Sequence, residues 1–230
     1  MRSAAVEAKE QAEYLDQKSI DSLRRKKPSA GYLAIKRLAD IVCASVALVC
    51  LSIPMLLVAL CIVLDSRGPA IYTQERIGKN NVPFRIYKFR TMYQNADKML
   101  SSLTPEQQKE WKENFKLTND PRITRVGKLL RRSSMDELPQ LLNILKGELS
   151  LVGPRPVLEE EAARYGANRA LFLSVTPGLT GYWQAYARNT CTYKQRMEME
   201  LFYVQHAGIR WDIRILFATV GRVLSGQGAR

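Results

Sequence analysis

The chain has 230 residues and a mass of 26.1 kDa, which is enough for one domain with a hydrophobic core. Its formal charge of +13 calls for an anionic partner, and nucleic acid, an anionic membrane surface and a charged metabolite all qualify. The cysteines (Cys43, Cys50, Cys61 and Cys191) form no C-x-x-C pair. This pattern argues against a disulfide framework or a zinc site and favours a reducing compartment.

A long apolar run follows a polar, basic beginning. Residues 1–30 end in a cluster of Arg and Lys at 24–27, and we expect them to form an extension outside the core. Residues 41–64 contain no charged side chain, and about 20 apolar residues suffice to cross a bilayer. The sequence therefore predicts an N-terminal extension over 1–30, a membrane helix over 31–68 and a globular domain over 69–230, which would carry any catalytic site.

Pro54 divides the apolar run into arms of roughly 13 and 10 residues, and each is too short for the ~30 Å hydrocarbon core. Proline kinks a helix, and Ser52 could donate to a carbonyl that the kink frees. Both flanks are basic, whereas a spanning helix carries its excess of Lys and Arg on the cytoplasmic side. We therefore predict a re-entrant helix that enters and leaves one leaflet, with a kinked spanning helix as the alternative.

The remainder has the pattern of a small globular domain. Residues 70–73 and 83–90 are strand candidates joined across a Gly-Lys-Asn-Asn turn. Helices are predicted from 105 to about 117, over 138–146 and over about 193–205, the first and last with capping boxes. Residues 211–224 mix apolar side chains with arginines, as in an interfacial helix, although packing into the core is the alternative. The fold class is α+β: a re-entrant membrane helix, then a mostly helical domain with a short β-hairpin and amphipathic interfacial helices.

Two adjacent carboxylates, Asp136 and Glu137, follow the most basic part of the chain, residues 122–132. Mg²⁺ is usually held by one or two carboxylates plus substrate phosphate oxygens, and Arg and Lys would bind the rest of the phosphate charge. Neighbouring helical residues point about 100° apart, so the two carboxylates are expected to have different roles. The alternative is that both are first-turn acids of the 138–146 helix, stabilised by its dipole.

One further arginine is stiffly presented, because Arg155 lies between Pro154 and Pro156. Such a guanidinium suits a phosphate, with a solvated turn arginine as the alternative. His206 has no histidine or cysteine close in the sequence with which to form a metal site, and we interpret it as structural.

Several motifs together resemble the bacterial sugar transferase family, the monotopic phosphoglycosyl transferases that begin glycan assembly on a polyprenyl phosphate. The resemblance covers about residues 32–224. It rests on KRLAD (36–40), DSRGP (65–69), QERIG (74–78), YKFRTM (87–92), DPRIT (120–124), DELPQ (136–140), LVGPRP (151–156) and TPGLTG (176–181). One departure is that Ile53 separates Ser52 from Pro54, where the family often has Ser-Pro.

The resemblance implies an enzyme that moves a sugar 1-phosphate from a UDP-sugar to polyprenyl phosphate with Mg²⁺ and releases UMP. The family is found at the cytoplasmic face of the bacterial inner membrane. Asp136 falls at the position of the family's nucleophile, which forms an aspartyl phosphosugar. We also expect Asp136 to be a ligand of the metal. Glu137 falls at the second position of the family's catalytic dyad. Lys88, Arg90, Arg131 and Arg155 fall at its basic, phosphate-binding positions.

Two other classes fit less well. A membrane-tethered nucleic-acid-binding protein would need aromatic residues interleaved with the basic ones, and the Asp136–Glu137 pair would repel its ligand. A purely structural anchor would not need that pair. We therefore expect UDP-sugar, polyprenyl phosphate and membrane lipid as partners and no nucleic acid, while the sugar and the oligomeric state are left open.

Overall fold

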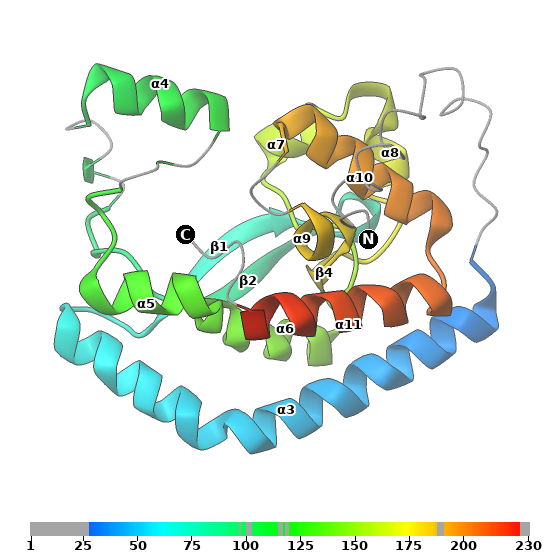
Figure 1. The fold of residues 1–230 in the computed structure, drawn as a ribbon, viewed down its shortest axis with the longest axis horizontal. Helices are drawn as coiled ribbons and strands as arrows, with labels where there is room; N and C mark the ends of the chain where they lie inside the picture. Colours follow the sequence, from blue (N-terminus) through cyan, green and yellow to red (C-terminus); the bar gives the residue numbers. More distant parts are fainter. Residues whose placement is uncertain are drawn as a thin grey trace.

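The structure is a computed structural model that describes residues 28–96, 98–99, 103–114, 117, 120–187 and 191–225. The predicted extension over 1–30 lies outside these residues as far as position 27. A long bowed helix, α3 (Ala30–Asp65), carries the rest of the described chain on its concave side (Figure 1). The α+β class is confirmed, whereas the division of the chain at 30 and 68 stays a prediction.

Helix α3 has 36 residues and continues past Pro54. It begins at an N-cap, where the Ser29 side chain accepts from the Tyr32 backbone N–H. Two residues before the proline, Ser52 Oγ donates to the Val49 carbonyl at 2.8 Å. The proline N–H would have bonded to the Cys50 carbonyl, so the Ser52 bond is not to the carbonyl that Pro54 frees. The sequence suggested two separate arms, but the structure has one bent helix that continues through Pro54, because the neighbouring turns keep their own hydrogen bonds.

The outer surface of α3 is apolar and uncovered in the described part of the chain. Four side chains (Tyr32, Asp40, Ala44 and Ile62) are buried against the domain, while large aliphatic residues from Leu33 to Leu64 are exposed. By length and composition, it is the one described helix that could cross a membrane. A helix so apolar on its exposed side requires an apolar environment.

Both ends of α3 are fastened to the same globular body. Near the first end, Lys36 bonds to Asp212 of α11 (Ile209–Ser225) at 2.7 Å. Arg37 donates to two last-turn carbonyls of α6 (Leu141–Lys146) at 2.6 and 2.8 Å. Asp40 accepts from two residues at the start of β3 (Ser150–Val152) at 2.8 and 3.1 Å. At the other end, Asp65 accepts a first-turn N–H of α5 (Arg125–Ser133) at 3.1 Å. The two ends therefore lie on one side of the bend (Figure 1).

The predicted hairpin is confirmed, with a longer first strand. Strands β1 (Ile71–Ile77) and β2 (Pro83–Phe89) pair antiparallel, and the short 3₁₀ helix η1 (Lys79–Asn81) connects them. Asn80 and Asn81 adopt left-handed φ angles of 56° and 65°, which asparagine tolerates better than most residues.

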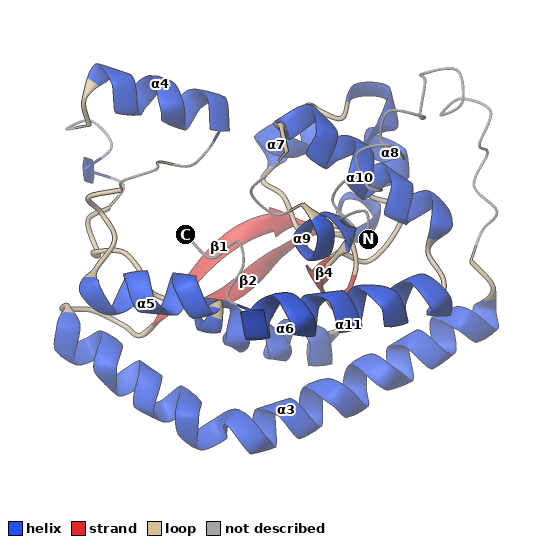
Figure 2. Cartoon of the chain, viewed as in Figure 1, coloured by secondary structure: helices blue, strands red, loops and turns tan. Residues whose placement is uncertain are grey.

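Most of the remaining domain is helical (Figure 2). The predicted capping boxes are present at Thr104 and Thr192. The predicted 138–146 helix is wrong at its start, because Pro139 lies in a 3₁₀ helix and α-helical structure begins only at Leu141. The helices are α4 (Pro105–Asn114), α5 (Arg125–Ser133), η3 (Met135–Gln140), α6 (Leu141–Lys146), α7 (Glu159–Ala163), η4 (Gly166–Asn168), α8 (Arg169–Phe172), α9 (Tyr182–Tyr186), α10 (Tyr193–His206) and α11 (Ile209–Ser225).

A second, parallel pair of strands joins two loops of the domain. Strand β3 (Ser150–Val152) pairs with β4 (Gly178–Thr180). The backbones approach so closely that a Cβ on Gly178 would lie 2.0 Å from the Gly153 nitrogen. Glycine is therefore required there, and the loop that carries Arg155 is pressed against the 176–181 loop.

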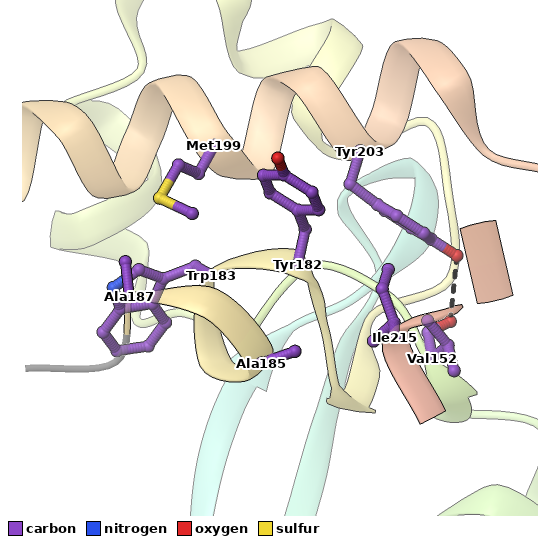
Figure 3. Close-up of a cluster of buried hydrophobic side chains, with 8 residues drawn as sticks. All are labelled: Val152, Tyr182, Trp183, Ala185, Ala187, Met199, Tyr203 and Ile215. Carbon is purple, nitrogen blue, oxygen red and sulfur yellow. Dashed lines mark hydrogen bonds between the residues drawn. The ribbon is translucent and has the colours of Figure 1, made fainter. Parts of the chain in front are cut away.

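One buried cluster joins β3 to α9, α10 and α11 (Figure 3). Within it, Tyr203 Oη donates to Asp212 of α11 at 2.6 Å. The inner side of α11 buries Asp212 and Ile215, while Ile213, Phe217 and Val220 are exposed. Both interpretations of this segment therefore hold in part: α11 packs into the core and also presents an apolar outer face.

Candidate active site

The two carboxylates lie on η3, between α5 and α6 and against β2. Ser134 ends α5 in the left-handed conformation, with φ of 59°, and this turns the chain into the 3₁₀ helix. The Asp136 and Glu137 side chains leave adjacent positions of that helix in different directions. They lie in the first turn of the 3₁₀ helix η3, and not in the first turn of the 138–146 helix as the alternative interpretation held. Cations from other segments lie beside them.

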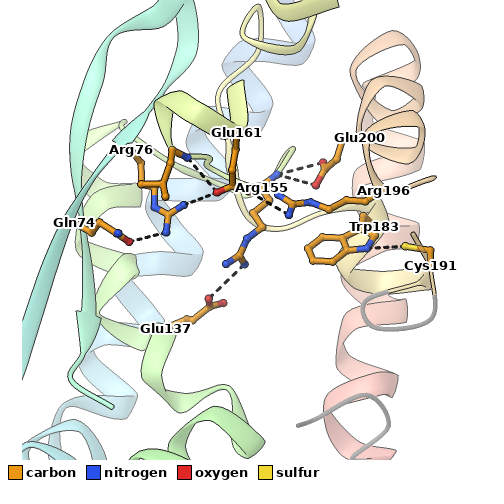
Figure 4. A network of polar contacts seen from close by, with 10 residues as sticks. Gln74, Arg76, Glu137, Arg155, Glu161, Trp183, Cys191, Arg196 and Glu200 are labelled. Carbon is orange, nitrogen blue, oxygen red and sulfur yellow. Dashed lines mark hydrogen bonds and ion pairs between the residues drawn. The ribbon is translucent and has the colours of Figure 1, made fainter. Parts of the chain in front are cut away.

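Glu137 lies between two cations that are distant in the sequence. Its Oε1 is 2.8 Å from Lys88 Nζ on β2. The same oxygen is 3.9 Å from Arg155 Nη1 (Figure 4). All three side chains are partly buried. The carboxylate therefore holds the two cations near each other at the domain surface, and both face the pocket described below.

Asp136 has a raised pKa. Burial, followed by the negative charge of Glu137, raises the pKa of its carboxyl to about 6, while the charges of Lys88 and Arg131 oppose this rise. Arg131 is itself oriented by a hydrogen bond from Nε to Thr91 Oγ1 at 2.9 Å. A carboxylate that is desolvated yet ionised near neutral pH, with cations beside it, is suited to nucleophilic attack on an anionic group.

A pocket beside the carboxylates is lined by three of the expected site residues, but not by Asp136 or Arg131, and by others that the sequence did not predict as site residues. Lys88, Glu137 and Arg155 line it, together with Arg76, Gln140 and Gln184. Arg76 Nε, Gln140 Nε2 and Gln184 Oε1 are buried and have no partner within the described residues. Buried polar atoms are rarely left unpaired, so these three indicate where a ligand would bond.

Two of these missed residues lie in motifs noted in the sequence, Arg76 in QERIG and Gln140 in DELPQ. Gln140 belongs to the DELPQ motif, four residues after Asp136, and so could have been linked to the carboxylates. Arg76 and Gln184 reach the pocket from β1 and α9, so only the tertiary structure brings them there.

Arg90 is not brought to this pocket. Its guanidinium donates four hydrogen bonds of 2.7–3.1 Å to the 66–69 loop that follows α3. Its side chain is buried, with 6% of its surface exposed. The geometry therefore gives Arg90 a structural role at the end of α3, in place of the expected phosphate contact.

The donor set at the carboxylates suits a metal only together with a substrate. Among the described residues, no three acidic, histidine or cysteine side chains gather as a metal cage. Asp136 and Glu137 supply two carboxylates, and Mg²⁺ commonly uses one or two of these plus phosphate oxygens. The site is therefore compatible with Mg²⁺ carried in by a phosphorylated ligand.

Comparison with known proteins agrees with this geometry. The model of a family described as bacterial sugar transferase matches residues 31–226. The chain belongs to the bacterial sugar transferase family. The match contains all the motifs on which the resemblance was based.

Relatives in this family carry related names. The chain is 43% identical over 198 residues to an undecaprenyl-phosphate galactose phosphotransferase of Salmonella typhimurium, which covers 85% of this chain and 41% of the relative. It is 46% identical over 198 residues to an uncharacterized sugar transferase of Haemophilus influenzae, covering 85% and 42%. It is 42% identical over 197 residues to the exopolysaccharide production protein ExoY of Rhizobium meliloti, covering 84% and 87%. The chain thus spans less than half the length of the first two relatives but most of the third.

Proposed function

We propose that the protein transfers a sugar 1-phosphate from a UDP-sugar to undecaprenyl or another polyprenyl phosphate and releases UMP, as the first membrane step of glycan or exopolysaccharide assembly. The observation that carries this proposal is the desolvated Asp136 carboxylate, with a pKa of about 6, beside Lys88 and Arg131. The names of the Salmonella and Rhizobium relatives support the substrate class and the pathway.

In the first step, an Asp136 oxygen attacks the phosphorus that carries the sugar. A new bond forms between this oxygen and phosphorus, and the bond to the bridging diphosphate oxygen breaks, so UMP leaves with that oxygen and its electron pair. Lys88 and Arg155 neutralise the diphosphate and the charge that develops on UMP. Arg131, held by Thr91, keeps Asp136 ionised and reduces the repulsion between two anions.

In the second step, an oxygen of the polyprenyl phosphate attacks the same phosphorus and Asp136 leaves as a carboxylate, which gives a polyprenyl diphosphate sugar. Glu137 orients Lys88 and Arg155 in both steps, since both cations lie within 4 Å of its Oε1. No water is consumed, so exclusion of water from the covalent intermediate protects the transfer.

Mg²⁺ would be held by Asp136, with Glu137 as the second available carboxylate, together with phosphate oxygens of the donor. When bound, it supplies positive charge that offsets the repulsion between carboxylate and diphosphate. The chain's own cations would contribute to the same task, Lys88 and Arg155 from the lining of the pocket and Arg131 from beside Asp136.

We further propose that α3 is a re-entrant membrane helix at the cytoplasmic face of the bacterial inner membrane. Support comes from its exposed apolar surface and from its two ends, which Asp40 and Asp65 tie to one body. A spanning helix would separate those ends by the ~30 Å hydrocarbon core. The apolar outer face of α11 would lie at the same interface.

The test is to incubate the purified protein in detergent with a UDP-sugar and Mg²⁺ but no acceptor. We expect stoichiometric UMP release and a phosphosugar on the peptide that contains Asp136, as found by mass spectrometry. Asp136→Asn should abolish both, and Glu160→Gln, an exposed acid on α7, should leave both unchanged. UMP release only after polyprenyl phosphate is added, with an unmodified peptide, would instead indicate direct transfer.

A further inference from the structure

The loop that presents Arg155 is anchored at several backbone atoms. The Gly153 N–H donates to the Thr180 carbonyl at 2.9 Å, and the Pro154 carbonyl accepts from Gly178 at 2.8 Å. Because Pro154 and Pro156 have no N–H, Arg155 carries the one backbone donor of the Pro-Arg-Pro segment. Whatever accepts that N–H therefore fixes how the arginine leaves the loop.

The acceptor is a buried carboxylate from another element. Glu200 of α10 is 1% exposed, and both its oxygens accept the Arg155 N–H at 3.2 Å (Figure 4). Burial raises the pKa of this carboxyl to about 7, while the Arg196 charge and the Arg155 N–H oppose the rise. Burying a carboxylate costs several kcal/mol unless it is compensated, so it needs such partners.

Glu200 belongs to a buried network of alternating charges behind the pocket. Arg196 lies 4.6 Å from the centre of the Trp183 ring, and its Nη1 is 3.4 Å from Glu161 on α7. Glu161 also pairs with Arg76 at 3.2 Å, and Arg76 lines the pocket. The network therefore connects α10 and α7 to two pocket arginines, Arg76 through its side chain and Arg155 through its backbone.

We propose that Glu200 is a positioning residue for the transfer reaction: by accepting the Arg155 backbone N–H, it aims the guanidinium at Glu137 and the donor phosphates. This inference rests on the proposed function and names a residue that touches neither substrate nor metal. The opposite face of the loop is held by backbone bonds, so Glu200 controls the remaining freedom of Arg155.

A double-mutant cycle with Glu200→Gln and Arg155→Ala tests this role. Glutamine has one acceptor oxygen and no charge, so Glu200→Gln should lower kcat/KM for the UDP-sugar about tenfold, and Arg155→Ala about a hundredfold. If Glu200 acts through Arg155, the double variant should be no worse than Arg155→Ala alone. An effect of about a thousandfold, the product of the two, would overturn the proposal, as would full activity of Glu200→Gln.

Controls separate positioning from folding. Glu160→Gln, an exposed acid of α7, should match the unchanged protein, and thermal unfolding should show each variant folded at the assay temperature. If Glu200→Gln does not fold, Glu200→Asp keeps the charge with a shorter reach and enters the same cycle with the same expected non-additivity. Absence of UMP release from the unchanged protein would refute the proposed function itself, and this outcome is distinct from additive losses in an active enzyme.

Discussion

The pKa of Asp136 leads to a prediction about the pH dependence of the first chemical step. With a pKa of about 6, Asp136 is roughly 90% ionised at pH 7 and roughly 9% ionised at pH 5. Only the ionised carboxylate attacks, so the single-turnover rate of UMP release without acceptor should fall about tenfold between these pH values. An ordinary aspartate, with a pKa near 3.9, would lose less than a tenth of its ionised form over the same range.

Two variants should shift the acidic side of this pH–rate profile, which we call the acid limb, in opposite directions. The positive charge of Lys88 lowers the pKa of Asp136, so Lys88→Gln should move the limb to higher pH. The negative charge of Glu137 raises that pKa, so Glu137→Gln should move the limb to lower pH, whatever its effect on the maximal rate. Quenched-flow measurement of UMP release from pH 5 to 8, in detergent and at UDP-sugar concentrations well below KM, gives the apparent pKa of Asp136 in the substrate-free form of each protein.

The same shift has a consequence for stability. The folded-state pKa of Asp136 lies above its unfolded value of 3.8, so its favourable contribution is complete below pH 3.8 and is lost as pH rises through about 6. At pH 8, ionisation in the folded state then costs on the order of 3 kcal/mol. Asp136→Asn should therefore unfold at a higher temperature than the unchanged protein at pH 8, with a smaller difference at pH 4.

A rate of UMP release independent of pH from 5 to 8 would refute the assignment of this pKa to the attacking carboxylate. Shifts of the acid limb in the same direction in Lys88→Gln and Glu137→Gln would also refute it.

Three further variants or pairs test the assigned roles. Arg131→Ala should reduce kcat/KM about a hundredfold, whereas Arg132→Ala, one residue further along α5 and exposed, should have little effect in detergent; equal losses would mean that both act through general charge. Arg90→Gln should lower the free energy of unfolding by on the order of 3 kcal/mol, seen in denaturant titrations, with the KM for UDP-sugar unchanged in the folded fraction; a raised KM in a stable protein would restore Arg90 as a phosphate ligand. In a cysteine-free background, Ala30→Cys and Lys79→Cys should both be protected from an impermeant maleimide added to intact cells, and labelling of one alone would refute the re-entrant arrangement.

Local patterns in the sequence predicted local structure well. The Thr104 and Thr192 capping boxes form because each needs only residues within one helical turn. The hairpin forms across a short turn with asparagines in left-handed conformations. The start of the 138–146 helix was wrong, because Pro139 permits a 3₁₀ turn that places Asp136 against β2, and contacts across the chain decide such a choice.

The sequence by itself determined the apolar helix, the carboxylate pair and the basic motifs, since composition and short spacings carry those signals. The tertiary structure alone decided which cations meet the carboxylates. Lys88, 49 residues from Glu137, lies 2.8 Å from it, whereas Arg90, two residues further along the chain, is turned to the end of α3. Two residues at positions i and i+2 of one strand would point to the same face, but β2 ends at Phe89. Arg90 therefore lies outside the strand, and long-range packing turns it to the loop after α3. The same packing buries Glu200 against the backbone of Arg155, a contact between residues 45 apart that no local pattern encodes.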